Sequence, residues 1–214
     1  MPDSCPTWDL TDLYEGIGDD AIAADLARCR REAERMERGL QGKIGDATPQ
    51  DLATLIADYE QVLEALGKAQ SHAQLLFAAS TTDAQIARHH QSIREASADI
   101  GARLLFVELE IAALPSDHVD RLLETAEFAA WQPWLRRVRA FAPHQLSPDM
   151  ERMLAERAPS GRGAWVRLFD ETAAGLRFPF GDAEVTEAEV LNKLSSPDAD
   201  ERREAGASLS QTLK

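Results

Sequence analysis

The sequence predicts an all-α fold, in which an antiparallel, coiled-coil-like helical bundle is followed by further short helices and at most one small β-hairpin. Three observations support this prediction. Apolar residues recur at steps of three and four along three long segments, near 20–40, 49–80 and 83–114. Capping residues, glycines and prolines mark the ends of these segments. The loops between them are short, which favours antiparallel neighbours.

The first long helix is predicted from about Asp20 to Leu40. Its apolar positions alternate steps of four and three, the spacing of a heptad seam. These positions are Ile22, Leu26, Cys29, Ala33, Met36 and Leu40. Gly39, Gly42 and Gly45 end the helix, because glycine weakens a helix interior.

The second long helix is expected to open at Thr48 as N-cap and Pro49 as first residue. Apolar residues recur every seven positions to about Ala79 in two series. They are Leu52, Tyr59, Leu66 and Ala73, and Leu55, Val62, Ala69 and Leu76. The segment Ser80–Asp83 then supplies a turn and a new cap.

The third long helix repeats the seven-residue spacing. Its seam consists of Ile86, Ile93, Ile100, Val107 and Leu114, joined by Leu104 and Ile111. Pro115 and Ser116 end this helix and begin a shorter one. The stretch WQPW at 131–134 begins another, whose apolar face extends to Pro143.

Two further helices are predicted at 147–158 and 160–176. Ser147 and Ser160 are expected as N-caps, and Pro159 separates the two helices. Each has a run of side chains on one side, Met150, Met153, Leu154 and Arg157 in the first and Trp165, Leu168, Phe169, Thr172 and Leu176 in the second.

An apolar stripe normally docks on a neighbouring element, so Trp165 is expected to be largely buried. Together with Trp131, Trp134 and Phe169, it could instead line a peptide groove. Packing between the bundle and the C-terminal helices is the favoured interpretation of these aromatic residues.

The C-terminal part contains one strand-like segment, Phe178–Val185, around a Gly-Asp turn signal. Thr186 and Glu189 form the capping box of a short helix. Ser196 is expected to cap the last helix, whose pattern is unfinished at Lys214.

Three motifs resemble one enzyme family. The opening WDLTDLY at 8–14 is similar to its N-terminal motif, and LSPDMERMLAERAPSGRGAWVRLFDE at 146–171 resembles a helix, a Gly-Arg turn and a Leu-Phe-Asp helix of the same family. The segment Leu194–Asp198, followed by Arg202–Ala205, is similar to its next signature. The family is that of oligoendopeptidase F-like zinc metallopeptidases, of the thimet oligopeptidase superfamily. The resemblance covers nearly all of this chain, but only the N-terminal third or so of such a peptidase.

The resemblance implies a helical wall or lid over a channel that admits short peptides. It also implies that a full enzyme uses zinc to activate water, with the glutamate of a His-Glu-x-x-His helix as general base. That motif does not occur in this chain. No catalytic, cofactor-binding or metal-ligating residue is therefore expected here, and the chain alone is expected to be inactive. A fragment lacking its catalytic part is favoured.

The expected organisation has three parts. Residues 1–18 form an N-terminal arm, with Trp8, Leu10, Leu13 and Tyr14 docked on helices elsewhere. Residues 19–145 form the long-helix bundle. Residues 146–214 form a helical segment leading towards the missing catalytic part.

Charge excludes one class of partner. The 214 residues include 23 Lys and Arg and 37 Asp and Glu, giving a net charge of −14. Nucleic-acid binding depends on clustered basic residues, so this balance argues against it. A solvated acidic surface is favoured over an acidic channel wall that steers peptides.

Cysteine usage and hydropathy bear on the compartment. The two cysteines, Cys5 and Cys29, fit a reduced compartment better than a disulfide framework, and Cys29 is expected to be a small buried apolar residue. No signal peptide precedes Trp8, and no apolar run reaches the roughly 20 residues of a membrane helix. A cytoplasmic location without membrane contact is expected.

Five histidines are the first candidates for a metal site. His89 and His90 are adjacent on a helix and diverge by about 100°, so they cannot share a tetrahedral site without distortion. His72 could face either one across the turn at 80–83, giving a two-ligand site at most. A structural role is favoured for all three. His118 and His144 have no ligand spacing around them.

Other candidate sites also have simpler interpretations. Three acidic pairs, Glu108 with Glu110, Asp149 with Glu151, and Asp170 with Glu171, are expected to be solvated, because acid–base work requires a pocket that separates their pKa values. The turn Ser160–Gly163 could bind an anion at a helix N-terminus, but a structural turn is favoured. The segment Gly39–Lys43 lacks the spacing of a phosphate loop.

Two functions therefore stay open. The first is the N-terminal channel-wall region of a cytoplasmic zinc metalloendopeptidase. Its partners are its own C-terminal catalytic region and short peptides, with self-association through exposed apolar surface. The alternative is a stand-alone helical adaptor that binds partner proteins through its coiled-coil hairpin.

Overall fold

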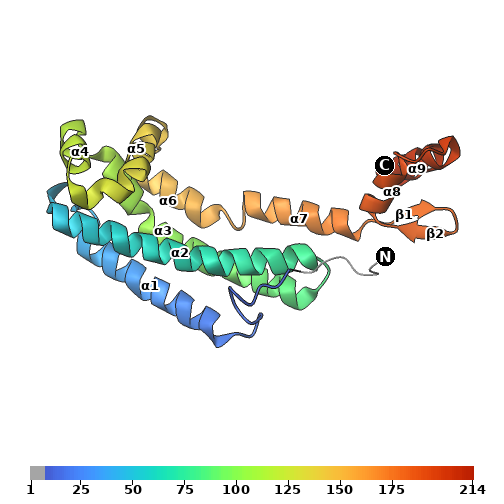
Figure 1. Ribbon diagram of the computed structural model, residues 1–214, viewed down its shortest axis with the longest axis horizontal. Helices are drawn as coiled ribbons and strands as arrows, with labels where there is room; N and C mark the ends of the chain where they lie inside the picture. The colour runs from blue at the N-terminus through green and yellow to red at the C-terminus, as the bar shows by residue number, and fades with distance from the viewer. Residues whose placement is uncertain (1–7) are drawn as a thin grey trace.

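The computed structural model describes residues 8–214, and its main body is an antiparallel bundle of three long helices (Figure 1). These are α1 (Asp20–Leu40), α2 (Pro49–Ala79) and α3 (Ala84–Ala113). The predicted bounds are confirmed to within about a residue. The predicted fold class is confirmed too, since the one sheet formed by the described residues is a two-stranded antiparallel hairpin.

The remaining elements continue along the bundle and past its end. In chain order they are α4 (Ser116–Leu123), α5 (Gln132–Phe141), α6 (Pro148–Arg157), α7 (Arg162–Gly175), β1 (Phe178–Phe180), β2 (Ala183–Val185), α8 (Glu187–Lys193) and α9 (Ala199–Thr212), with short 3-10 turns at Ile44–Asp46, Ala126–Trp131 and Ala142–His144. Helices α4 and α5 stand at one end of the bundle, and α6 and α7 run back alongside α3 (Figure 1). The strands, α8 and α9 lie at the other end, so the molecule is elongated.

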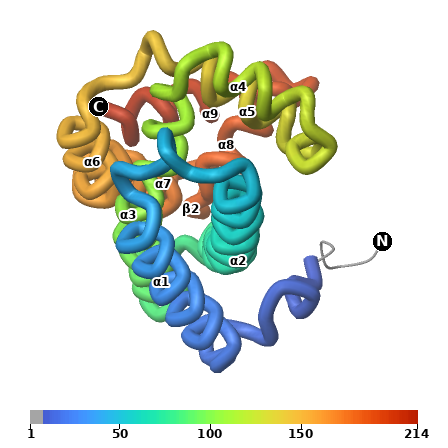
Figure 2. Tube along the Cα trace, turned by 90° about the vertical axis from the view of Figure 1, so that its left-hand side faces the viewer, coloured from blue at the N-terminus to red at the C-terminus, as the bar shows by residue number. Residues whose placement is uncertain are grey.

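The heptad seams form the core of the bundle. An end-on view shows α1, α2 and α3 around a common axis, with α6 outside them against α3 (Figure 2). The most completely buried side chains of this core include Leu52, Leu55, Ile56, Ile100, Leu104, Val107 and Ile111. Cys29 is fully buried in the same core, as expected, whereas Cys5 lies outside the described residues.

Several predicted helix caps are present. The hydroxyl of Thr48 accepts a hydrogen bond from the backbone N–H of Asp51 at 3.2 Å. The carboxylate of Asp83 accepts from the first N–H groups of α3. Thr186 and Glu189 form the predicted capping box at α8. These bonds satisfy helix N–H groups that would otherwise lack a partner.

Two predicted caps are wrong by one or two residues. Gly161, not Ser160, is the N-cap of α7, and Asp198, not Ser196, is the N-cap of α9. In both cases a serine lies in the preceding turn. The Ser160 hydroxyl donates instead to the carbonyl of Arg157, at 3.4 Å.

Arg139 fixes α5 to the end of α3. Its guanidinium donates to the backbone carbonyls of Ala112 and Leu114 and to the hydroxyl of Ser116. These carbonyls lie at the C-terminal end of α3, where no further helical N–H can reach them. The arginine thereby orients the helices that precede α6.

The N-terminal arm docks through Tyr14, which is buried beside α1 and α2. Its hydroxyl donates to the carboxylate of Asp25 at 2.9 Å, and the ammonium of Lys68 lies 4.1 Å from the ring centroid. The expected docking of Trp8 is wrong, because its side chain is largely exposed. The part of the arm at 1–7 lies outside the described residues.

The C-terminal unit, residues 176–214, has a small core of its own. Phe178, Val190 and Ala205 are fully buried against one another. The predicted hairpin is confirmed, with Phe178 paired to Val185 across it. Gly181 has a φ of 60°, a left-handed conformation that glycine adopts without strain.

A matched pair of leucine substitutions tests the bundle core. Leu104 is 1% exposed and Leu63 is 41% exposed, so Leu104→Ala removes many more contacts. We expect Leu104→Ala to lower the free energy of unfolding by about 2–5 kcal/mol, and Leu63→Ala by about 1 kcal/mol or less. Urea denaturation followed by circular dichroism measures both. Equal losses would contradict the assigned core.

Candidate functional site

Helix α6 packs on α3 through its more polar side. Glu151, Arg152 and Ala155 are half-buried in this contact. The guanidinium of Arg152 lies 3.7 Å from the carboxylate of Glu37, which also pairs with Arg103 at 3.0 Å. This network joins α6, α1 and α3. The apolar side of α6 therefore faces away from the bundle.

Helix α7 has the same orientation, and here the prediction of a buried Trp165 is wrong. Trp165 is 72% exposed and Phe169 is 71% exposed. Gly163, Ala164 and Arg167 are the partly buried residues of the first turns. Arg167 reaches α3 with its side chain, which donates to Gln91, and the large apolar side chains of α7 lie on its exposed side.

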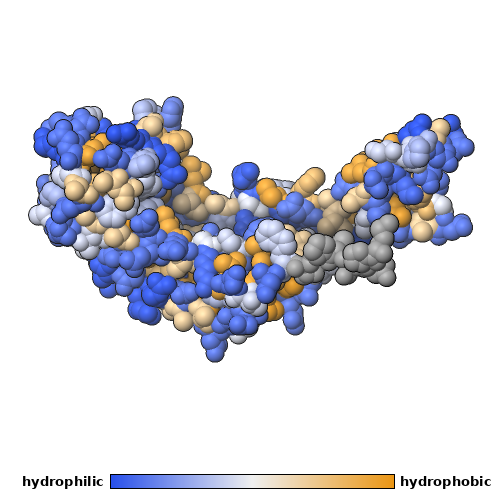
Figure 3. All heavy atoms as spheres, in the orientation of Figure 1, coloured by the Kyte–Doolittle hydropathy of each residue, from blue (hydrophilic) through white to orange (hydrophobic). Residues whose placement is uncertain are grey.

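We call the exposed apolar residues of α6, of α7 and of the segment that leads into α6 the outward stripe. It consists of Phe141, Leu146, Met150, Met153, Leu154, Trp165, Val166, Leu168 and Phe169. The space-filling view is hollowed between the α4–α5 end and the C-terminal unit, and apolar atoms lie along this concave side (Figure 3). Contiguous apolar surface of this kind usually marks an interaction site.

The other predicted aromatic residues do pack against the bundle. Trp131 and Trp134 are half-buried against the main core. The indole N–H of Trp131 donates to the carboxylate of Glu60 at 3.1 Å, and its ring lies 6.0 Å from that of Phe128. These two tryptophans therefore pack on the bundle itself, and the expected position between the bundle and the C-terminal helices is not the one they occupy.

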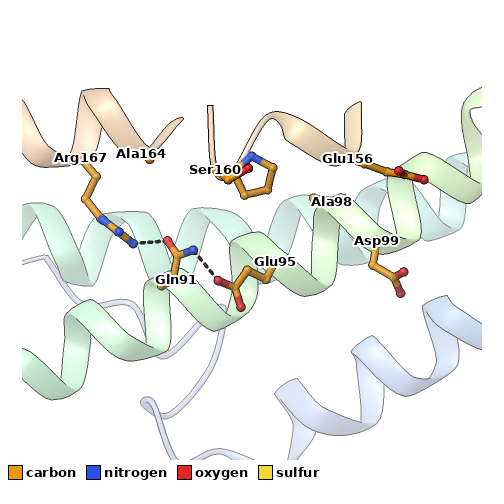
Figure 4. A pocket seen from close by; sticks show the side chains of 9 residues that line it. Gln91, Glu95, Ala98, Asp99, Glu156, Ser160, Ala164 and Arg167 are labelled. Atoms are coloured by element: carbon orange, nitrogen blue, oxygen red, sulfur yellow. Dashed lines mark hydrogen bonds between the residues drawn. The ribbon is translucent and has the colours of Figure 1, made fainter. Parts of the chain in front are cut away.

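An open cavity of about 570 Å³ lies between α3 and the α6–α7 turn (Figure 4). Arg167 donates to the side-chain carbonyl of Gln91, and the Gln91 amide donates to Glu95 at 2.6 Å. Asp99 and Glu156 also line the cavity. Its carboxylates can accept hydrogen bonds from amide or cationic groups, but none is paired with a base or nucleophile here.

The α6–α7 turn is structural, as favoured. The N–H of Gly161 donates to the carbonyl of Arg157 at 2.7 Å, and that of Gly163 donates to the carbonyl of Ala158 at 3.0 Å. These two N–H groups are therefore not available to an anion. A Cβ on Gly163 would lie 2.8 Å from the Ala158 carbonyl oxygen, closer than real side chains approach.

The turn between α2 and α3 brings His72 and His89 together, as the predicted hairpin implied. Their ring centroids are 6.2 Å apart, and His72 also contacts the Tyr14 ring at 5.3 Å. Neither nitrogen of His72 has a hydrogen-bond partner among the described residues. His118 lies within α4, and His144 ends the 3-10 turn before α6.

The histidine pair does not provide a zinc site. Within residues 8–214, no group of three or more His, Cys, Asp or Glu side chains is arranged to hold a metal ion. Tight zinc sites require three or four protein ligands. The described residues therefore do not fit a resident zinc ion, and we derive no catalytic step through one.

Burial affects the protonation of the histidines in this region. Desolvation lowers the pKa values of His72, His89 and His90 below the ordinary value of 6.5. Nearby Arg94 and Arg167 lower the pKa of His90 further. Burial also raises the pKa of Tyr14, and its hydrogen bond to Asp25 adds to this effect.

Known proteins resemble this chain in part of its sequence and in its fold. Residues 110–178 match the N-terminal family model described as Oligopeptidase F. The fold matches the crystal structure of oligoendopeptidase-F from Enterococcus faecium with a TM-score of 0.71, over 90% of this chain at 17% sequence identity. This chain is therefore similar to oligoendopeptidase F in its fold and, over residues 110–178, in its sequence. It spans 39% of the length of that structure. No curated protein matches it by sequence.

The sequence alone did not reveal that the outward stripe is exposed. Helical spacing correctly grouped the apolar residues of α6 and α7. The residues that are partly buried lie on the other side of each helix and include Ala155, Gly163 and Ala164. Separately, no helix formed by residues 8–214 combines the length and apolar character needed to cross a membrane.

Acidification tests the buried histidines. The pKa values of these histidines lie below 6.5 in the folded state. At a pH between the folded-state pKa and the unfolded-state value of 6.5, the unfolded chain therefore binds more protons than the folded chain. Their contribution to stability is full above pH 6.5 and falls as the pH decreases towards the folded-state values. We expect the urea concentration at the unfolding midpoint to decrease when the pH is lowered from about 7.5 to about 5.5. His72→Gln should flatten this dependence, and His144→Gln, at an exposed position, should not. Identical pH profiles for both variants would contradict the assignment.

Two tryptophan substitutions test the stripe. Trp131→Ala removes packing and a hydrogen bond, so we expect a large fall in the urea midpoint. Trp165→Ala should change the free energy of unfolding by about 1 kcal/mol or less, compared with about 3–5 kcal/mol for a buried tryptophan. A loss at Trp165 as large as that at Trp131 would show that this part of the stripe is covered within the chain.

Proposed function

We propose that this chain is the N-terminal channel-wall or lid region of a cytoplasmic zinc-dependent metalloendopeptidase that acts on short peptides. In this proposal the catalytic part and its zinc ligands lie outside residues 1–214, and the three-part organisation at 1–18, 19–145 and 146–214 leads towards them. The proposal is supported by the fold, which is that of an oligoendopeptidase F N-terminal region.

The observation that carries the proposal is the outward stripe. Helices α6 and α7 place Met153, Leu154, Trp165 and Phe169 away from their own bundle. Burying such residues against a second body would remove a large apolar area from water. We propose the catalytic region as that body, because the chain corresponds to 39% of the comparison structure.

The contribution of this region would be shape rather than chemistry. A wall set against a catalytic part restricts entry to short, flexible peptides, and its closure excludes water from the reaction. Acidic side chains such as Glu95, Asp99 and Glu156 line the one cavity beneath the α6–α7 turn. Facing the channel, they would favour peptides that carry basic groups.

The test adds this chain to a separately produced catalytic part, encoded beyond Lys214. Alone, the chain is expected neither to hold stoichiometric zinc nor to cleave a mixture of quenched fluorescent peptides. Added to the catalytic part, it should bind and shift the preferred peptide length. The double variant Trp165→Ser, Phe169→Ser should weaken binding by about tenfold or more, since each 1.4 kcal/mol is tenfold. The control Leu63→Ser, Leu75→Ser, on the exposed side of α2, should bind normally.

Three outcomes oppose the proposal. Zinc binding with steady turnover by the chain alone would show that it is not a catalytically incomplete region. Association without any effect on peptide length or rate would leave a purely stabilising role. A coding sequence that stops at Lys214 would favour the alternative, an adaptor that uses the same stripe or the coiled-coil hairpin for other proteins.

A further inference from the structure

A second, smaller cavity lies between α2, α3 and the first turns of α7, on the bundle side of α7. Its volume is about 330 Å³. Phe77 and Val166 supply apolar wall, and Arg94, Arg162 and His90 supply polar groups. Asp170 is the one carboxylate among the residues that line it.

Two arginines in this cavity have no ion-pair partner. Arg167 is already engaged, since it donates to Gln91 and lies 3.7 Å from the carboxylate of Glu171. Within the part of the chain that the structure describes, Arg94 and Arg162 have neither an ion pair nor a hydrogen bond.

The third polar group is His90, which is 5% exposed. Its ring stacks on Phe77 with centroids 4.8 Å apart, and its Nδ1 atom has no hydrogen-bond partner among residues 8–214. This atom is itself shielded from solvent, so His90 lines the cavity with the rest of its ring. The two cationic residues that flank it would hold an acceptor of hydrogen bonds.

The guanidinium of Arg94 lies against the α7 backbone at Gly163. A Cβ at this position would collide with Nη2 of Arg94, so a larger residue would displace the guanidinium. The start of α7 also carries the positive end of the helix dipole. Its Gly161 and Gly163 N–H groups already bond to carbonyls, so side chains must make the direct contacts.

We propose that Arg94, Arg162 and His90 form a binding site for the oxyanion of a small organic acid. Guanidinium groups match the planar geometry of a carboxylate. The apolar wall of Phe77 and Val166 suits a short hydrocarbon substituent, which inorganic phosphate lacks. Val166 belongs both to this cavity and to the outward stripe, but the site does not depend on the proposed peptidase role.

Calorimetric titration of the chain at constant ionic strength tests this site, with butyrate, inorganic phosphate and chloride as the three ligands. We expect saturable binding of butyrate, weaker binding of phosphate and no saturable heat with chloride. Arg162→Gln and Arg94→Gln should each weaken butyrate binding by about tenfold or more. His90→Phe, which keeps the stack on Phe77, should weaken it as well. Arg136→Gln removes the same charge from an exposed position on α5 and should have no effect.

Arg162 is exposed at the start of α7, so its substitution leaves the packed core intact and provides a test even if Arg94→Gln unfolds the chain. Absence of saturable butyrate binding overturns the proposal. An equal loss in Arg136→Gln also overturns it, because the effect would then be one of total charge. Phosphate binding without butyrate binding overturns the assignment to an organic acid.

Discussion

The burial of α3 is the constraint on which the rest of the structure depends. This helix packs against α1 and α2 through its seam, and it also supports α5 and α6. Ile100, Leu104 and Val107 are almost completely removed from water. A helix covered on so many sides cannot rotate or slide without exposing apolar area, so every element that contacts it has a fixed place.

The positions of α6 and α7 follow from that constraint. Once α1 and α2 cover the apolar seam of α3, its remaining surface is polar, with Gln91, Glu95 and Asp99 along it. Such a surface pairs with polar and small residues, which is what α6 and α7 present. The large apolar side chains of α6 and α7 find no apolar surface on this side of α3. They are consequently exposed and form the outward stripe.

Sequence reasoning succeeded where local patterns determine the outcome. The seven-residue spacing through Ile93, Ile100 and Val107 fixes which side of α3 is buried, and the bounds of the three long helices follow from capping residues that act within one turn. The approach of His72 and His89 also followed, because positions equidistant from a short turn face one another.

The same reasoning failed where the outcome depends on distant parts of the chain. Spacing shows that Trp165 and Phe169 share a face, but it does not show which body covers that face. The cavity at Arg94 was likewise invisible, because it exists only when α7 lies beside α3, and these helices are separated by α4, α5 and α6. Both sides of a helix can pack on a neighbour, so an apolar stripe by itself does not show which side is buried.

The C-terminal unit is joined to the rest of the chain through α7 and has its own core of Phe178, Val190 and Ala205. Helix α7 therefore connects the C-terminal unit to the tight turn before Gly163. Its 14 residues are about 21 Å long at 1.5 Å per residue. A change of about 10° in the direction of the α7 axis at this turn would displace the far end of the helix by about 4 Å. The direction that α7 takes from this turn therefore sets how far the C-terminal unit lies from the α4–α5 end (Figure 1).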